Sequence, residues 1–173
     1  MTAYIALLRA VNVGGTGKLA MSDLVRLCAE AGFREARTYI ASGNVVFASD
    51  LAEAEVKARL EKALAAHAGK PVGVAVRTAA EMAAVLKANP FPDAEPKFTV
   101  AIFLDEKPPK DAAEKATGRA EDEEIALGGR EIYVSYGSGM GRSKLKIPAA
   151  KTGTARNMNT VAKLAEMAAE IEG

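Results

Sequence analysis

Short apolar runs, each bounded by glycine, proline or other turn residues, alternate with amphipathic segments along this chain of 173 residues. The run Tyr4–Arg9 is almost continuously apolar, which predicts a strand buried on both faces. A helix is predicted next, with Ser22 as its cap and Gly32 at its end. Its apolar stripe holds Leu24, Leu27, Cys28 and Ala31.

The following segments predict two strands, a helix and another strand. Strands Arg37–Ile40 and Val45–Phe47 flank the turn signal Ser42-Gly43-Asn44. Asp50 and Glu53 have the spacing of a capping box, and the helix that they start would end at Gly69. With a strand at Val72–Val76, the order becomes βαββαβ, which is the ferredoxin-like arrangement.

A bridging helix comes next, followed by a segment that interrupts the helical pattern. Thr78 and Glu81 form a second capping box, and Asn89-Pro90-Phe91-Pro92 interrupts the pattern. We therefore place a boundary near residues 90–96, with a first half over 1–90 that includes the bridging helix and a second half over 97–173.

The second half repeats the same order of elements. We expect a strand at Phe98–Leu104, a short helix at Asp111–Ala116, and a hairpin of Ile125–Leu127 and Ile132–Ser135 around Gly128-Gly129. An irregular stretch with Pro148 precedes a last helix from about Asn157. The predicted fold class is α+β, with two ferredoxin-like (βαββα) halves, mainly antiparallel sheets and helices packed on them.

Composition excludes several classes of protein. Net charge is +1, so no overall field favours nucleic acid or a membrane surface. The single cysteine, Cys28, rules out an internal disulfide and a cysteine-cluster metal site. No apolar run approaches the ~20 residues that span a bilayer, and the first residues lack the pattern of a signal peptide. We expect a cytoplasmic protein with no membrane partner; the sequence does not indicate its oligomeric state.

Several stretches together resemble the bacterial "domain of unknown function 1697" family. They are residues 6–15 (ALLRAVNVGG), 37–47 (RTYIASGNVVF), 89–91 (NPF) and 154–164 (TARNMNTVAKL). The resemblance implies a duplicated ferredoxin-like α+β fold and no known activity. Ala10 stands where the family usually has Gly, and Met158 where it usually has Trp.

Familiar catalytic and cofactor motifs are absent or incomplete. A phosphate-binding P-loop needs Gly where Asn12 stands and Ser or Thr where Leu19 stands. The Gly-rich segments also lack the third Gly of a dinucleotide fingerprint. His67, the only histidine, is expected in the last turn of its helix, where its role would be structural. The acidic run Glu121–Glu124 is interpreted as a solvated turn, because neighbouring side chains do not converge on one cation. We predict no cofactor and no metal.

The most informative feature is where acidic residues are missing. Residues 1–22, 36–49 and 132–165 contain no Asp or Glu, and the last of these windows holds six basic residues. At helical spacing Arg156, Thr160 and Lys163 would share one face near the helix start, where Thr154 or Asn157 could act as the cap. A guanidinium, a hydroxyl and open N–H groups favour a phosphate or carboxylate.

We therefore predict that three segments meet in one site for a small anionic ligand: the loop 12–18, the turn 42–44 and the helix start 154–160. The candidate residues are Arg9, Asn12, Gly14, Gly15, Lys18, Arg37, Ser42, Gly43, Asn44, Thr154, Arg156, Asn157, Thr160 and Lys163. Each feature also has a structural interpretation, as a turn, a helix cap or an ordinary basic surface.

The sequence itself assigns no activity, and it leaves other functions open. A binding module for RNA or DNA is one alternative, although the strands lack the aromatic pattern of RNA-recognition motifs. An enzyme of unknown reaction acting on a phosphorylated substrate is another, with Tyr39, Lys18 and Lys163 as acid–base candidates. A further alternative is an interaction protein with no pocket.

Overall fold

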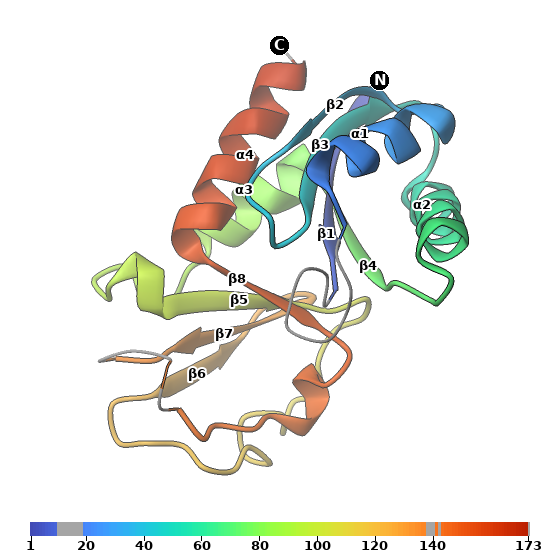
Figure 1. Cartoon of the computed structure of the whole chain (residues 1–173). Helices are drawn as coiled ribbons and strands as arrows, with labels where there is room; N and C mark the ends of the chain where they lie inside the picture. The colour runs from blue at the N-terminus through green and yellow to red at the C-terminus, as the bar shows by residue number, and fades with distance from the viewer. Residues whose placement is uncertain (10–18, 138–140, 142, 173) are drawn as a thin grey trace. The chain divides into compact units, whose positions relative to one another are not determined.

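The computed structural model describes residues 1–9, 19–137, 141 and 143–172 (Figure 1). Their contacts divide the chain into two compact units, Met1–Met82 with Lys163–Gly173, and Ala83–Ala162. Each unit contains one four-stranded antiparallel sheet. The predicted α+β fold with two ferredoxin-like halves is confirmed. The boundary at 90–96 stays a prediction.

In the first unit, two helices pack on one face of the sheet (Figure 1). The strand order is β2-β3-β1-β4, so β1 is paired on both sides. Its residues from Ala3 to Leu8 are buried, as its nearly continuous apolar sequence predicts. The strands are β1 (Thr2–Leu8), β2 (Arg34–Thr38), β3 (Asn44–Ser49) and β4 (Val74–Thr78), and the helices are α1 (Met21–Glu30) and α2 (Glu53–Ala68).

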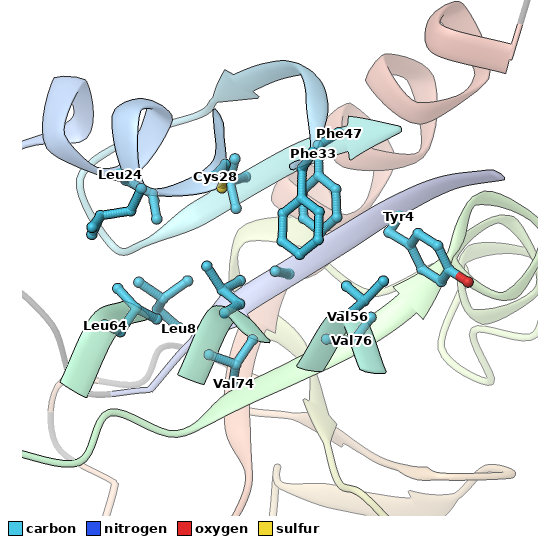
Figure 2. Close-up of a cluster of buried hydrophobic side chains, with 14 of the residues drawn as sticks. Tyr4, Leu8, Leu24, Cys28, Phe33, Phe47, Val56, Leu64, Val74 and Val76 are labelled. Carbon is cyan, nitrogen blue, oxygen red and sulfur yellow. The ribbon is translucent and has the colours of Figure 1, made fainter. Parts of the chain in front are cut away.

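The core of this unit lies between the sheet and these two helices (Figure 2). Alternate residues of β1, such as Tyr4 and Leu8, point toward the helices, because successive side chains of a strand face opposite ways. Phe33 and Phe47 stack with ring centroids 4.4 Å apart and planes 8° from parallel. Cys28 is fully buried among these residues, as its place on the apolar stripe predicts.

The second unit repeats the strand order with other connections. Its sheet has the order β6-β7-β5-β8, which matches β2-β3-β1-β4 position by position. The strands are β5 (Thr99–Phe103), β6 (Glu124–Leu127), β7 (Glu131–Ser135) and β8 (Thr154–Asn157). Helix α3 (Ala79–Lys87) leads into this unit and α4 (Met158–Glu172) leads out of it. The internal duplication is therefore present in the topology of the sheets.

Two elements of the second unit differ from expectation. The prediction of a helix at Asp111–Ala116 is wrong, because these residues form turns. They contain a single hydrogen bond of the α-helical i to i−4 kind, from Lys115 N to Asp111 O (3.0 Å). Two prolines precede this segment and Gly118 follows it at φ 73°. The stretch between them is too short to offset the cost of nucleating a helix. The strand β8 was not predicted, because four mostly polar residues carry no strand signal until β5 pairs with them.

The helix caps are partly as predicted. Helix α1 begins at Met21 and α2 at Glu53, and neither has a side-chain cap, so Ser22 and Asp50 are not caps. The chain before α2 is held by other bonds, since Leu51 N donates to Ser49 Oγ and Leu51 O accepts from Tyr4 Oη.

The capping box of α3 is confirmed. Thr78 N donates to Glu81 Oε1 (2.9 Å), and Glu81 N donates to Thr78 Oγ1 (3.1 Å). Helix α4 begins at Met158, close to the predicted start, and Asn157 Oδ1 accepts from Thr160 N (2.9 Å). Within the part of the chain that the structure describes, no helix is long and apolar enough to cross a membrane.

Truncating Phe47 tests the core of the first unit. Phe47 is fully buried and stacks on Phe33, so we expect Phe47→Ala to lower the free energy of unfolding by about 3–5 kcal/mol. Urea unfolding followed by circular dichroism measures the change. Leu127→Ala is the control, because this side chain is 37% exposed and its loss should change stability by less than about 1 kcal/mol. A small effect at Phe47 would contradict the described packing.

The thiol of Cys28 gives a pH-dependent test of the same core. Burial raises its pKa from 9.0 to about 12, so the folded chain holds this proton more tightly than the unfolded chain. The resulting stabilisation is complete below about pH 8 and is lost as the pH rises from 9 toward 12. We expect a disulfide reagent to label Cys28 at pH 8 only as fast as the protein unfolds. Rapid labelling of the native protein would contradict the burial.

Candidate functional site

The end of β1 lies beside the turn that joins β2 to β3. Leu8 N donates to Gly43 O (2.8 Å), which extends the β1–β3 pairing beyond its last register pair, Leu7 and Asn44. On the other side, Arg9 N donates to Gly73 O (2.9 Å) just before β4. The backbone of Arg9 is thus fixed at one end of the sheet, and this residue is exposed.

Asn44 organises the turn. It is fully buried, and its Nδ2 donates to Tyr39 O (2.8 Å) and to Ser42 Oγ (2.9 Å). Tyr39 N in turn donates to Asn44 O (3.1 Å), and Gly43 adopts a φ of 91° that favours glycine. The turn predicted at residues 42–44 is confirmed, and its geometry is set by a buried amide.

Ile40 precedes this turn in a strained conformation that the sequence does not signal. Its φ is 53°, in the left-handed region, where a β-branched residue is a clear outlier. Its side chain is nevertheless 50% exposed, so burial of that side chain does not explain the residue. Glu35, the other non-glycine residue at positive φ among the described residues, lies where the pairing of β2 with β3 shifts register, which is a bulge. Strain without such an explanation is characteristic of ligand sites.

Four of the predicted binding residues, Asn12, Gly14, Gly15 and Lys18, lie outside the described residues. Their role in binding stays a prediction.

Two of the predicted cations have carboxylate partners. Arg37 Nη1 lies 3.3 Å from Glu170 Oε2, and Lys163 Nζ lies 3.7 Å from Glu166 Oε1. Both pairs are about half exposed, so each contributes little to stability. The two carboxylates nevertheless weaken the positive potential predicted around the segments that lack Asp and Glu.

Arg156 lies in strand β8, not on the face of the last helix. Its Nη1 donates to Thr154 Oγ1 (2.6 Å) and to Ala155 O (2.9 Å). Burial lowers its pKa to about 10, so the guanidinium stays protonated at neutral pH. The expectation that Arg156, Thr160 and Lys163 share a helical face is wrong, because residues 154–157 are extended.

The turn 42–44 belongs to the first unit and the segment 154–160 to the second. Convergence of the three segments in one site therefore stays a prediction. Within the first unit, the structure brings the backbone of Leu8, the residue before Arg9, to Gly43 of the turn, whereas the backbone of Arg9 itself is bonded to Gly73.

The interpretation of Glu121–Glu124 as a solvated turn is wrong for one of its residues. Glu123 is only 2% exposed, and its carboxylate accepts hydrogen bonds from Ala120 N (2.7 Å) and from Ser143 Oγ. Its neighbours Glu121, Asp122 and Glu124 are exposed. Since the side chains point to different environments, the run does not form one cation site.

Comparison with known proteins identifies the family. The family described as "Protein of unknown function (DUF1697)" matches residues 1–133. This chain belongs to the DUF1697 family. The DUF1697 match includes the end of β1, the turn 42–44 and the Asn89-Pro90-Phe91 segment, whereas β8 and α4 lie beyond it.

A solved structure supports the fold over nearly the whole chain. It is that of the conserved bacterial protein SP0830 from Streptococcus pneumoniae, which is 26% identical to this DUF1697 chain with a TM-score of 0.79. The alignment covers 96% of this chain and 98% of that one. None of the curated proteins matches the sequence.

Substitutions at Ile40 test whether its backbone is strained. In the left-handed region a Cβ costs about 1 kcal/mol or more, so we expect Ile40→Gly to be more stable than Ile40→Ala by about 1 kcal/mol. Both variants lose the same apolar side chain, so their difference isolates the backbone term. The measurement is urea unfolding.

The same pair of substitutions at Leu127 is the control. Leu127 lies in β6 with an ordinary φ, so alanine should there be the more stable by about 0.5–1 kcal/mol. The same order of stability at both positions would show that Ile40 is not strained.

Proposed function

We propose that this protein binds a small anionic ligand, bearing a phosphate or a carboxylate, at the end of the first sheet beside Arg9 and the turn Ser42–Asn44. The observation that carries the proposal is the hydrogen bond from Leu8 N to Gly43 O. It holds the end of β1 beside a hydroxyl-bearing turn on a rigid sheet, and the exposed Arg9 is the next residue along the chain. Binding groups on loops that a rigid scaffold positions are the usual composition of ligand sites.

The chemistry of these groups favours an anion. A guanidinium offers charge-assisted hydrogen bonds to phosphate and carboxylate oxygens. Ser42 Oγ accepts a hydrogen bond from the buried Asn44 amide, which fixes the position of this hydroxyl in the turn. Residues 36–49 contain no carboxylate to compete with a bound anion.

The strain at Ile40 agrees with this interpretation. A protein that merely needed a turn here would favour Gly or Asn at a left-handed position, because these residues adopt it at low cost. Keeping Ile40 in that conformation costs free energy of folding, while its side chain extends half into solvent. An exposed apolar group beside Ser42 would contact the uncharged part of a ligand.

Thermal unfolding with a panel of anions tests the proposal. Inorganic phosphate, pyrophosphate, adenosine monophosphate and acetate serve as probes. A ligand at one hundred times its Kd stabilises the protein by about 2.7 kcal/mol, which corresponds to an increase in Tm of about 5–10 °C for a chain of this size. We expect Arg9→Gln to weaken binding by about 10–100-fold, the usual loss for a hydrogen bond to a charged group.

Arg34→Gln is the matched control, because Arg34 is also exposed and lies in the same unit, in β2. It changes net charge equally and should leave binding unchanged. Equal losses in both variants would mean that the anion responds only to overall charge. Binding that weakens by orders of magnitude with added salt, and only for polynucleotides, would favour nucleic acid instead.

A further inference from the structure

The second unit contains an open hollow of about 460 Å³, in the size range of small-molecule sites. It combines an apolar lining with charged groups. The lining residues are Phe91, Ala113, Glu114, Arg119, Glu124 and Ile125. They come from three separate stretches of the chain, and we refer to this site as the Phe91 hollow.

Phe91 is held in place by its own turn. Phe91 N donates to Asn89 Oδ1 (3.0 Å), and Ala94 N donates to Phe91 O (3.1 Å). The ring is half-buried, so it lines the hollow without filling it. The Asn89-Pro90-Phe91 motif, which marks the family resemblance, therefore supplies an aromatic wall.

Two carboxylates belong to the same lining. Glu114 and Glu124 are both exposed, and neither carboxylate forms a hydrogen bond or an ion pair with any residue that the structure describes. Arg119 differs, because its Nη1 donates to Glu123 O (2.6 Å) and is thereby fixed to the backbone. The formal charge of the lining is −1, from two glutamates and one arginine.

We propose that the Phe91 hollow binds a small organic cation, an amine or amidinium carried on an apolar or aromatic body. The apolar side chains of Phe91, Ala113 and Ile125 would contact the body, and the two glutamates would pair with the cation. An aromatic ring adds attraction for a cation. A bare metal ion fits less well, since hard cations require six or more oxygen ligands.

This proposal is independent of the anion site, which lies in the other unit and requires the opposite charge. Its probes are benzylamine and benzamidine, compared with the neutral benzyl alcohol and the anionic benzoate. Saturation-transfer NMR and titration of the full chain measure binding. Because the hollow is open, we expect Kd values of about 1 mM for the two cations, and binding at least fivefold weaker for the neutral and anionic probes.

Matched variants locate the binding. Glu124→Gln and Glu114→Gln preserve shape and should each weaken benzylamine binding about two- to fivefold, the range for an exposed ion pair. Phe91→Ala should abolish detectable binding, and Phe91→Leu should retain part of it. Glu106→Gln, an exposed carboxylate of the same unit outside the hollow, should have no effect.

Three outcomes would overturn the proposal. Benzyl alcohol binding as tightly as benzylamine would show that charge plays no part. An equal loss in Glu106→Gln would show a response to overall charge only. Unchanged binding in Phe91→Leu, Glu114→Gln and Glu124→Gln, with circular dichroism confirming that each variant is folded, would place the amine elsewhere on the protein.

Discussion

The backbone hydrogen bond from Leu8 to Gly43 connects the core of the first unit to its candidate site. Strand β1 is paired on both sides, so its position is fixed by the sheet, and this bond carries that fixed position into the turn. Asn44 then fixes the turn itself, because a fully buried amide must keep its hydrogen-bond partners. The position of the Arg9 backbone therefore follows from the pairing of β1 with β3 and β4 in the sheet.

Sequence patterns predicted the elements that depend on local chemistry. Short, nearly continuous apolar runs located the central strands, and the Thr78–Glu81 pair located a helix start, because both signals are complete within a few residues. Strand β8 depends on pairing with the distant β5, and Ile40 adopts a conformation opposed to its own propensity. Likewise, no local pattern could bring Phe91 and Glu124 into one hollow, since tertiary structure alone brings them together.

The two units have equivalent strand orders, although different kinds of chain segment pack on their sheets. In the first, α1 and α2 cover the sheet, whereas in the second Leu145, Ile147, Ala149 and Ala150, from an irregular segment, pack on the core of β5 and β7. At Gly153 the backbone of this segment comes too close to β5 to carry a side chain. A Cβ at Gly153 would lie 2.8 Å from Ile102 and from Leu104, so glycine is required at this contact.

Irregular chain also lines the hollow of the second unit, whose two carboxylates have no side-chain partner within the part of the chain that the structure describes. Side chains on a helix can pair at spacings of three or four residues, as Arg26 does with Glu30 and Lys57 with Glu61. Asp111 and Lys115 pair at the same spacing in the turn of the second unit, whereas Glu114 of that turn and Glu124, which begins a short edge strand, have no such partner among the described residues. A net charge of +1 for the chain therefore conceals local differences, with a basic group exposed at the end of one sheet and acidic groups exposed around a hollow of the other unit. Because electrostatic attraction between exposed charges decays within about 10 Å at ordinary ionic strength, ligand charge is selected by these local groups and not by the total.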